Sequence, residues 1–201
     1  MGLDSAAGFR EELTARLARH DASRPLMPFD VPPESLRPAA VLLPLMAGNG
    51  GDGLQVMLTR RSSELRSHAG QISFPGGRID ATDANPEAAA LREAEEEVGL
   101  PPDAVEIIGS MRPYQTGTGY LIHPIVGLIE RAVKLRRNPS EVEEIFHVPL
   151  AFFLDPLNHR PHTMEYQGRT HHLYAMPYKD YYIWGATAAI LREFYLVVSG
   201  D

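Results

Sequence analysis

The chain has 201 residues, and its 44% hydrophobic and 22% charged residues are ordinary for a globular protein. Its 26 acidic residues outnumber 19 basic ones, and the net charge of −7 argues against a non-specific nucleic-acid binder, which is normally basic. The absence of cysteine excludes disulfides, zinc–thiolate sites and a cysteine nucleophile. We expect a cytoplasmic protein with no membrane partner, because no apolar run reaches roughly 18 residues and the N-terminus does not resemble a signal peptide.

The N-terminal region is predicted to be a helix followed by a linker. Residues 7–20 carry apolar side chains at four-residue intervals, which indicates an amphipathic helix. The proline-rich stretch 24–37 should be irregular and extended, and it could wrap its own domain or a neighbouring molecule. We therefore divide the chain into an N-terminal helix and linker, residues 1–37, and a single domain, residues 38–201.

Strands and helices alternate in the domain without a regular βαβ rhythm. The pattern predicts strands at 39–48, 53–61, 104–111 and 122–130, a strand or turn near 141–148, a brief helix from Pro149, a hairpin at 162–176 and a last helix at about 183–198. Residues 62–85 are expected to be rich in loops, and Trp184 is expected to pack in the core under the last helix. The fold class is therefore α+β or α/β with a mixed sheet.

One further helix is delimited clearly by its ends. Asn85 is a good N-cap, and Pro86 suits the first helical position. Gly99 is expected to end the helix, with prolines directly beyond it.

The end of this helix, LREAEEEVGL, contains four glutamates where the helix dipole and like-charge repulsion disfavour them. On a helical wheel Glu93, Glu96 and Glu97 fall together opposite the apolar face, and Glu95 falls outside this patch. Acidic patches are usually solvated surface. Here the preceding glycine turn, FPGG, favours a site where carboxylates and backbone carbonyls bind a hard cation, Mg²⁺ or Mn²⁺.

This segment resembles the signature of the Nudix hydrolases, G-x5-E-x7-R-E-U-x-E-E-x-G-U, in which U is apolar. Residues 92–100 match its second half at every position. In the first half, Gly77 comes one residue early, and the acids near the place of the middle glutamate are Asp83 and Asp80. The resemblance implies a Nudix-type α/β/α sandwich with a mixed sheet, and metal-dependent hydrolysis of a nucleoside diphosphate derivative with Mg²⁺ or Mn²⁺.

The resemblance also implies roles for individual residues. Metal binding is implied for the carboxylates of Glu93, Glu96 and Glu97 and for the carbonyl of Gly77. A structural role is expected for Arg92, holding an acid of the loop such as Asp83.

The stretch MLTRRSSELRSHAGQISFPGG, residues 57–77, is similar to the motif upstream of the signature in coenzyme A diphosphatases, L-L-T-x-R-S-x3-R-x3-G-x3-F-P-G-G. Only the first leucine differs. The resemblance implies hydrolysis of coenzyme A, its acyl thioesters or its oxidised form to 3′,5′-ADP and a 4′-phosphopantetheine compound. Substrate binding is implied for Arg61, Arg66, Gly76 and Gly77. Because strand side chains alternate, Arg60 should face away from Arg61.

The general base is left open between two sources. Glu97 or Glu96 could orient water as well as bind metal. A glutamate of the separate segment SEVEEIF is the other source, and Glu144 is preferred there over Glu141 and Glu143.

Two alternatives to a coenzyme A diphosphatase remain. One is a Nudix hydrolase of another nucleoside diphosphate derivative, such as ADP-ribose, NADH or a modified nucleoside triphosphate. The other is a non-catalytic nucleotide-binding regulator, which the complete glutamate triad disfavours. The expected partner is a small nucleotide rather than nucleic acid or membrane, and the chain is a candidate for a homodimer.

Overall fold

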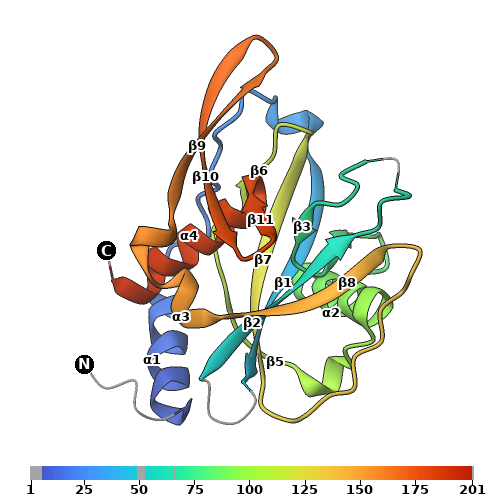
Figure 1. The fold of residues 1–201 in the computed structure, drawn as a ribbon, viewed down its shortest axis with the longest axis vertical. Helices are drawn as coiled ribbons and strands as arrows, with labels where there is room; N and C mark the ends of the chain where they lie inside the picture. The colour runs from blue at the N-terminus through green and yellow to red at the C-terminus, as the bar shows by residue number, and fades with distance from the viewer. Residues whose placement is uncertain (1–5, 49–52, 66, 201) are drawn as a thin grey trace.

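The computed structural model describes residues 6–48, 53–65 and 67–200, which form a mixed sheet flanked by helices and a smaller sheet beside it (Figure 1). The larger sheet contains β1 (Arg37–Ala47), β2 (Leu54–Arg61), β3 (Ile72–Ser73), β4 (Gly76–Arg78), β5 (Glu106–Ser110), β6 (Tyr114–Gln115), β7 (Tyr120–Ile129) and β8 (Val142–Pro149). The smaller sheet contains β9 (Arg160–Tyr166), β10 (Arg169–Tyr178) and β11 (Tyr181–Trp184). The α-helices are α1 (Ala6–Arg19), α2 (Pro86–Val98), α3 (Leu150–Phe153) and α4 (Gly185–Ser199), with 3₁₀ turns at Pro33–Ser35, Pro102–Ala104 and Pro156–Asn158. None of the helices in these described ranges is long and apolar enough to cross a membrane.

The larger sheet is mixed because its central strand β1 has neighbours of both directions. β1 runs parallel to β7, from Arg37 opposite Tyr120 to Met46 opposite Ile129. It runs antiparallel to β2, which in turn pairs antiparallel with β8. The principal order is β3–β2–β1–β7–β5, and the short strand β4 also pairs with β1.

Two apolar clusters cover the two faces of this sheet. Along β1, Leu42 faces the cluster that includes Ala94 of α2, whereas Leu43 and Leu45 face the cluster that includes α1 and α4. This alternation follows from the two-residue period of a strand. α2 thus lies on one face and α1 and α4 lie on the other, which confirms the predicted α/β/α sandwich with a mixed sheet (Figure 1).

The N-terminal helix packs on the domain as its periodicity predicts. Its buried side chains are Phe9, Leu13 and Leu17. A buried carboxylate on α4, Glu193, holds the adjoining segments together. It accepts hydrogen bonds from both Arg112 Nε (2.7 Å) and Arg112 Nη2 (3.0 Å), and His20 Nε2 at the end of α1 lies 3.3 Å away.

The proline-rich linker packs against its own domain, which is one of the two alternatives left by the sequence. Leu26 forms a bridge with Tyr114 of β6, donating its N–H to the Pro113 carbonyl and accepting from the Gln115 N–H. The chain then passes along the smaller sheet before it enters β1 (Figure 1).

Two short strands were missed, and one predicted boundary is wrong. The loop-rich stretch 62–85 contains β3 and β4, whose pairing with β2 and β1 is set by tertiary contacts and not by a local apolar pattern. The last helix begins at Gly185, because residues 181–184 extend the predicted hairpin by a third strand. Trp184 is therefore the last residue of β11 and lines a cavity; it is not packed in the core as expected.

Candidate active site

A cavity of about 600 Å³ opens between α2, the larger sheet and the smaller sheet. This volume is within the range of small-molecule sites, about 300–1,000 Å³. Its lining includes the acids Glu93, Glu97 and Glu141, together with Arg61 and the glycines at the start of β4. Glu93 and Glu97 of α2, Arg61 of β2 and the glycine turn are thus brought together from separate parts of the chain. Glu96, which the sequence placed with them, is exposed and does not line the cavity.

α2 has the ends that the sequence predicts. The Asn85 side chain accepts a hydrogen bond from the Ala88 N–H at 2.8 Å, and Pro86 occupies the first turn. Gly99 ends the helix in the left-handed conformation, with φ of 65°. These ends fix the position of the last turns of α2, and the glutamates lie on those turns.

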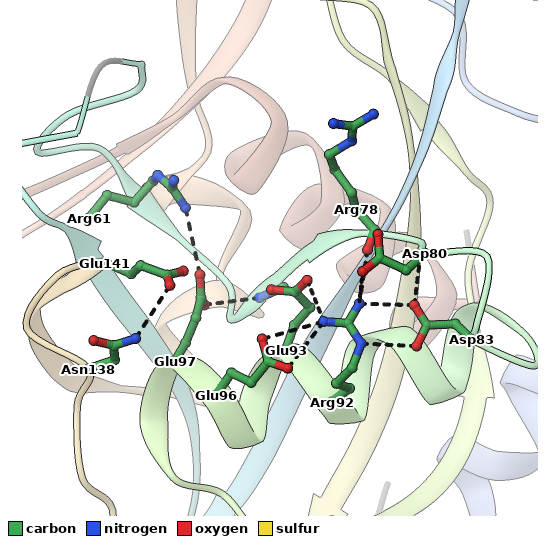
Figure 2. Close-up of polar contacts among 11 residues, drawn as sticks. Arg61, Arg78, Asp80, Asp83, Arg92, Glu93, Glu96, Glu97, Asn138 and Glu141 are labelled. Carbon is green, nitrogen blue, oxygen red and sulfur yellow. Dashed lines mark hydrogen bonds and ion pairs between the residues drawn. The ribbon is translucent and has the colours of Figure 1, made fainter.

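Glu97 is the most deeply buried acid of the cavity, with 3% of its surface exposed. Its Oε2 accepts a hydrogen bond from the Gly76 N–H at 3.1 Å, and its Oε1 lies 3.7 Å from Arg61 Nη1 (Figure 2). Burial raises the Glu97 pKa to about 7, against the lowering effects of the Gly76 hydrogen bond and Arg61. The prediction that Glu97 faces away from the apolar side is wrong: it lies at the edge of the buried face, between α2 and β4.

Two consecutive glycines let the backbone pass close to these acids. Gly76 has φ of 153°, and a Cβ there would lie 2.6 Å from Val41 Cα of β1. A Cβ at Gly77 would lie 2.5 Å from the Glu93 carboxyl carbon. Both positions therefore need glycine for different reasons: Gly76 for backbone packing against β1, and Gly77 for the space that the Glu93 carboxylate occupies.

Arg92 ties the loop before α2 to the helix. Its Nε and Nη2 donate to Asp83 Oδ1 and Oδ2 at 3.0 and 2.9 Å, and Nη2 also donates to the Arg78 carbonyl at 3.1 Å. Its Nη1 donates to Glu93 Oε1 at 2.9 Å and lies 3.5 Å from Glu96 (Figure 2). The paired hydrogen bonds from Arg92 lower the Asp83 pKa. This is the loop-holding contact expected from the sequence, and it also orients Glu93.

The two neighbouring arginines of β2 diverge as strand alternation predicts. Arg61 points to Glu97, whereas Arg60 lies 3.6 Å from Glu144 and over the Tyr181 ring at 5.2 Å. Arg66, the other predicted substrate ligand, lies outside the described residues.

Glu144 and Glu141 have different surroundings. Glu144 is opposite Arg60 in the β2–β8 pairing, accepts a hydrogen bond from the Tyr181 hydroxyl at 2.7 Å and is not part of the cavity lining. Glu141, just before β8, lines the cavity and accepts a hydrogen bond from Asn138 Nδ2 at 3.3 Å. Its charge contributes to the raised pKa of Glu97. The start of β8 separates the two acids, because Glu141 precedes the strand and Glu144 lies within it, and the sequence did not locate that start.

The carboxylates near the end of α2 suit a hard cation, although Arg92 contacts both Glu93 and Glu96. In the described ranges no three His, Asp or Glu side chains are gathered into a ready-made metal site. The carboxylates of Glu93, Glu96 and Glu97 nevertheless supply the oxygen ligands that Mg²⁺ and Mn²⁺ prefer. Burial raises the pKa values of both Glu93 and Glu97, so their anionic forms are under-compensated by the protein alone. A cation in this place would supply the missing positive charge.

Comparison with known proteins decides the family. A profile of the NUDIX domain matches residues 36–166, which is more than half of the chain. The chain belongs to the Nudix hydrolase family. Over 162 residues, this Nudix hydrolase is 45% identical to an uncharacterized Nudix hydrolase named NudL from Escherichia coli K12, covering 81% of the chain and 83% of that protein.

Solved structures agree with the fold of this Nudix hydrolase. The crystal structure of DR0079 from Deinococcus radiodurans is 18% identical, with a TM-score of 0.51 over 83% of this chain and 90% of that one. The MutT/nudix family protein from Enterococcus faecalis is 17% identical, with a TM-score of 0.50 over 100% of this chain and 82% of that one. Membership of the family makes the protein an enzyme, a hydrolase of diphosphate compounds.

Proposed function

We propose that this Nudix hydrolase cleaves the diphosphate bond of coenzyme A, or of its acyl or oxidised forms, to give 3′,5′-ADP and a 4′-phosphopantetheine compound. The observation that carries the proposal is the stretch 57–77. Its register with the coenzyme A diphosphatase motif selects Arg61, and Arg61 is the β2 arginine that points into the cavity beside Glu97. A guanidinium at this position suits the charge and shape of a phosphate.

We propose Mg²⁺ or Mn²⁺ as the cofactor, held by Glu93, Glu96 and Glu97 with the carbonyl of Gly77. When bound, the cation neutralises charge on the diphosphate and acts as a Lewis acid. Arg92 holds Glu93 in the place that Gly77 leaves free, and its hydrogen bonds to Asp83 keep the loop against α2. The protein thus supplies the oxygen ligands and fixes the loop on which one of them lies.

We propose that Glu141 removes the proton from the attacking water. Its carboxylate lines the cavity and is close enough to Glu97 and Glu93 to raise the pKa values of both. Glu144 is engaged by Tyr181 and Arg60 on the other side of β8. A proton acceptor must reach the water that attacks, and Glu141 has the position for this role.

Glu141→Gln and Glu144→Gln form a matched pair for the base assignment, since both change one carboxylate of the same segment to an amide. We expect kcat to fall roughly 10²–10⁴-fold in Glu141→Gln, which is the usual contribution of a general base, and to change little in Glu144→Gln. The reverse pattern would return the role to Glu144, and full activity in both variants would leave it with a glutamate of α2.

The substrate is tested by incubating the protein with Mg²⁺ or Mn²⁺ and, separately, coenzyme A, an acyl-coenzyme A, ADP-ribose, NADH and 8-oxo-dGTP. Chromatography of the products should show 3′,5′-ADP from the coenzyme A compounds at the highest kcat/KM. Fast turnover of another compound with none of coenzyme A would overturn the substrate assignment while leaving a Nudix hydrolase. Dephospho-coenzyme A, compared with coenzyme A, reports whether the 3′-phosphate is bound.

A further inference from the structure

The cavity extends well beyond its acids, and the elements that line it differ in character. α2, β2 and the segment just before β8 contribute Glu93, Glu97, Glu141 and Arg61. The linker, the smaller sheet and α4 contribute six other lining residues, which we call the aromatic end: Phe29, Met164, Tyr166, Leu173, Trp184 and Ile190. The substrate therefore meets charge beside α2 and β2, and an apolar wall beside the linker and the smaller sheet.

The linker is fixed in place where it forms this wall. The Phe29 N–H donates to Gln115 Oε1 at 3.2 Å, and Gln115 Nε2 donates to the Val31 carbonyl at 2.9 Å. Gln115 is fully buried. Next to Phe29, Asp30 forms an ion pair of 2.9 Å with Arg169 of β10. Phe29 is thus held on both sides by contacts to the domain.

The Phe29 ring packs into a group of aromatic side chains over the loop that follows β6. Its centroid lies 4.6 Å from that of His171 and 6.1 Å from that of Tyr166, which it meets edge to face. The Tyr166 hydroxyl donates to the Gly117 carbonyl at 2.8 Å, and a Cβ at Gly117 would come within 2.9 Å of the Tyr166 ring. This part of the wall is close-packed and joins the smaller sheet to the larger one.

Charge decides which part of the substrate fits here. Among the described lining residues, the arginines are Arg61 and Arg78, which flank the acids on β2 and β4. None of the six residues of the aromatic end carries a formal charge. Placing a ribose 3′-phosphate against such a wall would bury charge without a partner, which is costly. An uncharged part of the substrate with an apolar terminus would instead bind more favourably there, because the contact buries apolar surface.

We infer that the aromatic end binds the pantetheine arm of the substrate and the acyl group on its sulfur, so that the enzyme favours acyl thioesters over free coenzyme A, with Phe29 as a specificity-determining residue. This inference rests on the proposed function and refines its substrate class. It also gives the N-terminal linker a part in the site, since Phe29 lies outside the region 38–201 that the sequence assigned to the domain. The nucleoside part of the substrate would then extend from the diphosphate toward Arg61 and Arg78.

The selectivity ratio tests this inference: kcat/KM for octanoyl-coenzyme A divided by kcat/KM for free coenzyme A. We expect it to exceed one in the unmodified protein and to fall about tenfold in Phe29→Ala, because a few buried methylenes in an apolar pocket account for such factors. Met27→Ala is the matched control: Met27 belongs to the same linker, is 45% exposed and does not line the cavity. Phe29→Leu, which keeps apolar bulk, should give an intermediate ratio and serves if Phe29→Ala does not fold.

The outcomes separate the inference from the proposed function. An unchanged ratio in both Phe29 variants, with coenzyme A still hydrolysed, overturns the inference and leaves the function. A wild-type ratio of one or less does the same. No turnover of either compound by the unmodified protein overturns the function, and the assignment of the arm is lost with it.

A second measurement needs no variant, because Trp184 is the single tryptophan of the chain and lines the aromatic end. Its fluorescence should shift on addition of octanoyl-pantetheine and stay constant with 3′,5′-ADP. A shift with 3′,5′-ADP alone would place the nucleoside at this end. No shift with octanoyl-pantetheine at concentrations that inhibit turnover would likewise contradict the inference.

Discussion

Glu97→Gln should stabilise the metal-free protein at alkaline pH while removing its activity. Glu97 is 3% exposed, and burial raises its pKa from 4.5 to about 7. At roughly 1.4 kcal/mol per pH unit, keeping this carboxylate ionised above pH 7 costs the folded state about 3 kcal/mol. Glutamine keeps the shape and can still accept the Gly76 hydrogen bond, but it carries no charge.

The sign of the effect depends on pH. Below pH 4.5 the carboxyl is protonated in the folded and unfolded states, so the free energy of unfolding is not affected by its titration. Between pH 4.5 and 7 the folded state holds a proton that the unfolded state has released, so this group makes the wild type less stable as pH rises. The advantage of Glu97→Gln should therefore be absent at pH 4.5 and full at pH 8.

Thermal unfolding followed by circular dichroism in EDTA measures this difference. For a chain of this size, about 3 kcal/mol corresponds to a rise in Tm of at least ~6 °C at pH 8. Adding Mg²⁺ should raise the Tm of the wild type more than that of the variant, because a cation that binds the folded state stabilises it. Equal Tm values in EDTA at both pH 4.5 and pH 8 would refute the view of Glu97 as an under-compensated buried acid.

Three other substitutions test separate parts of the account. Gly76→Ala should cost on the order of 3 kcal/mol in a denaturant titration, because its Cβ would meet the backbone of β1. Gly77→Ala should leave that stability nearly unchanged but lower metal-dependent kcat/KM by roughly tenfold or more, since the three atoms nearest to the added methyl all belong to the Glu93 carboxylate. Wild-type kcat/KM in Gly77→Ala would argue against Glu93 as a metal ligand. Glu193→Ala should cost about 2–4 kcal/mol, as it leaves the Arg112 guanidinium unpaired, and a loss below 0.5 kcal/mol would contradict the linking role of this carboxylate.

The sequence predicted the parts of the fold whose causes are local. Asn85, Pro86 and Gly99 delimit α2 by capping chemistry, and the structure has the same ends. Strand alternation correctly separated Arg60 from Arg61. The short strands β3 and β4 were missed because they exist only through pairing with β2 and β1, to which their own side chains give no clue.

The site was predictable as far as contiguous motifs reach. The glycine turn and the glutamates of α2 lie in one segment, residues 74–97, and a helical wheel groups the three glutamates. The wheel placed Glu97 opposite the apolar face, whereas the structure buries its side chain. Glu141 could not be separated from Glu144 without knowing that β8 begins at Val142, after Glu141 and before Glu144. Phe29 lines the cavity only because the linker packs back against the domain. That packing depends on contacts with residues far away in the sequence, so no local pattern predicts it.

The measurement that tests the central claim most directly is the Mg²⁺-dependent release of 3′,5′-ADP from coenzyme A, followed by chromatography for the wild type and Glu97→Gln. The account predicts release by the wild type with Mg²⁺, none in EDTA, and a loss of at least ~10²-fold in the variant. Contradiction would come from release that continues undiminished in EDTA or in Glu97→Gln, or from no release by the wild type while another diphosphate is cleaved.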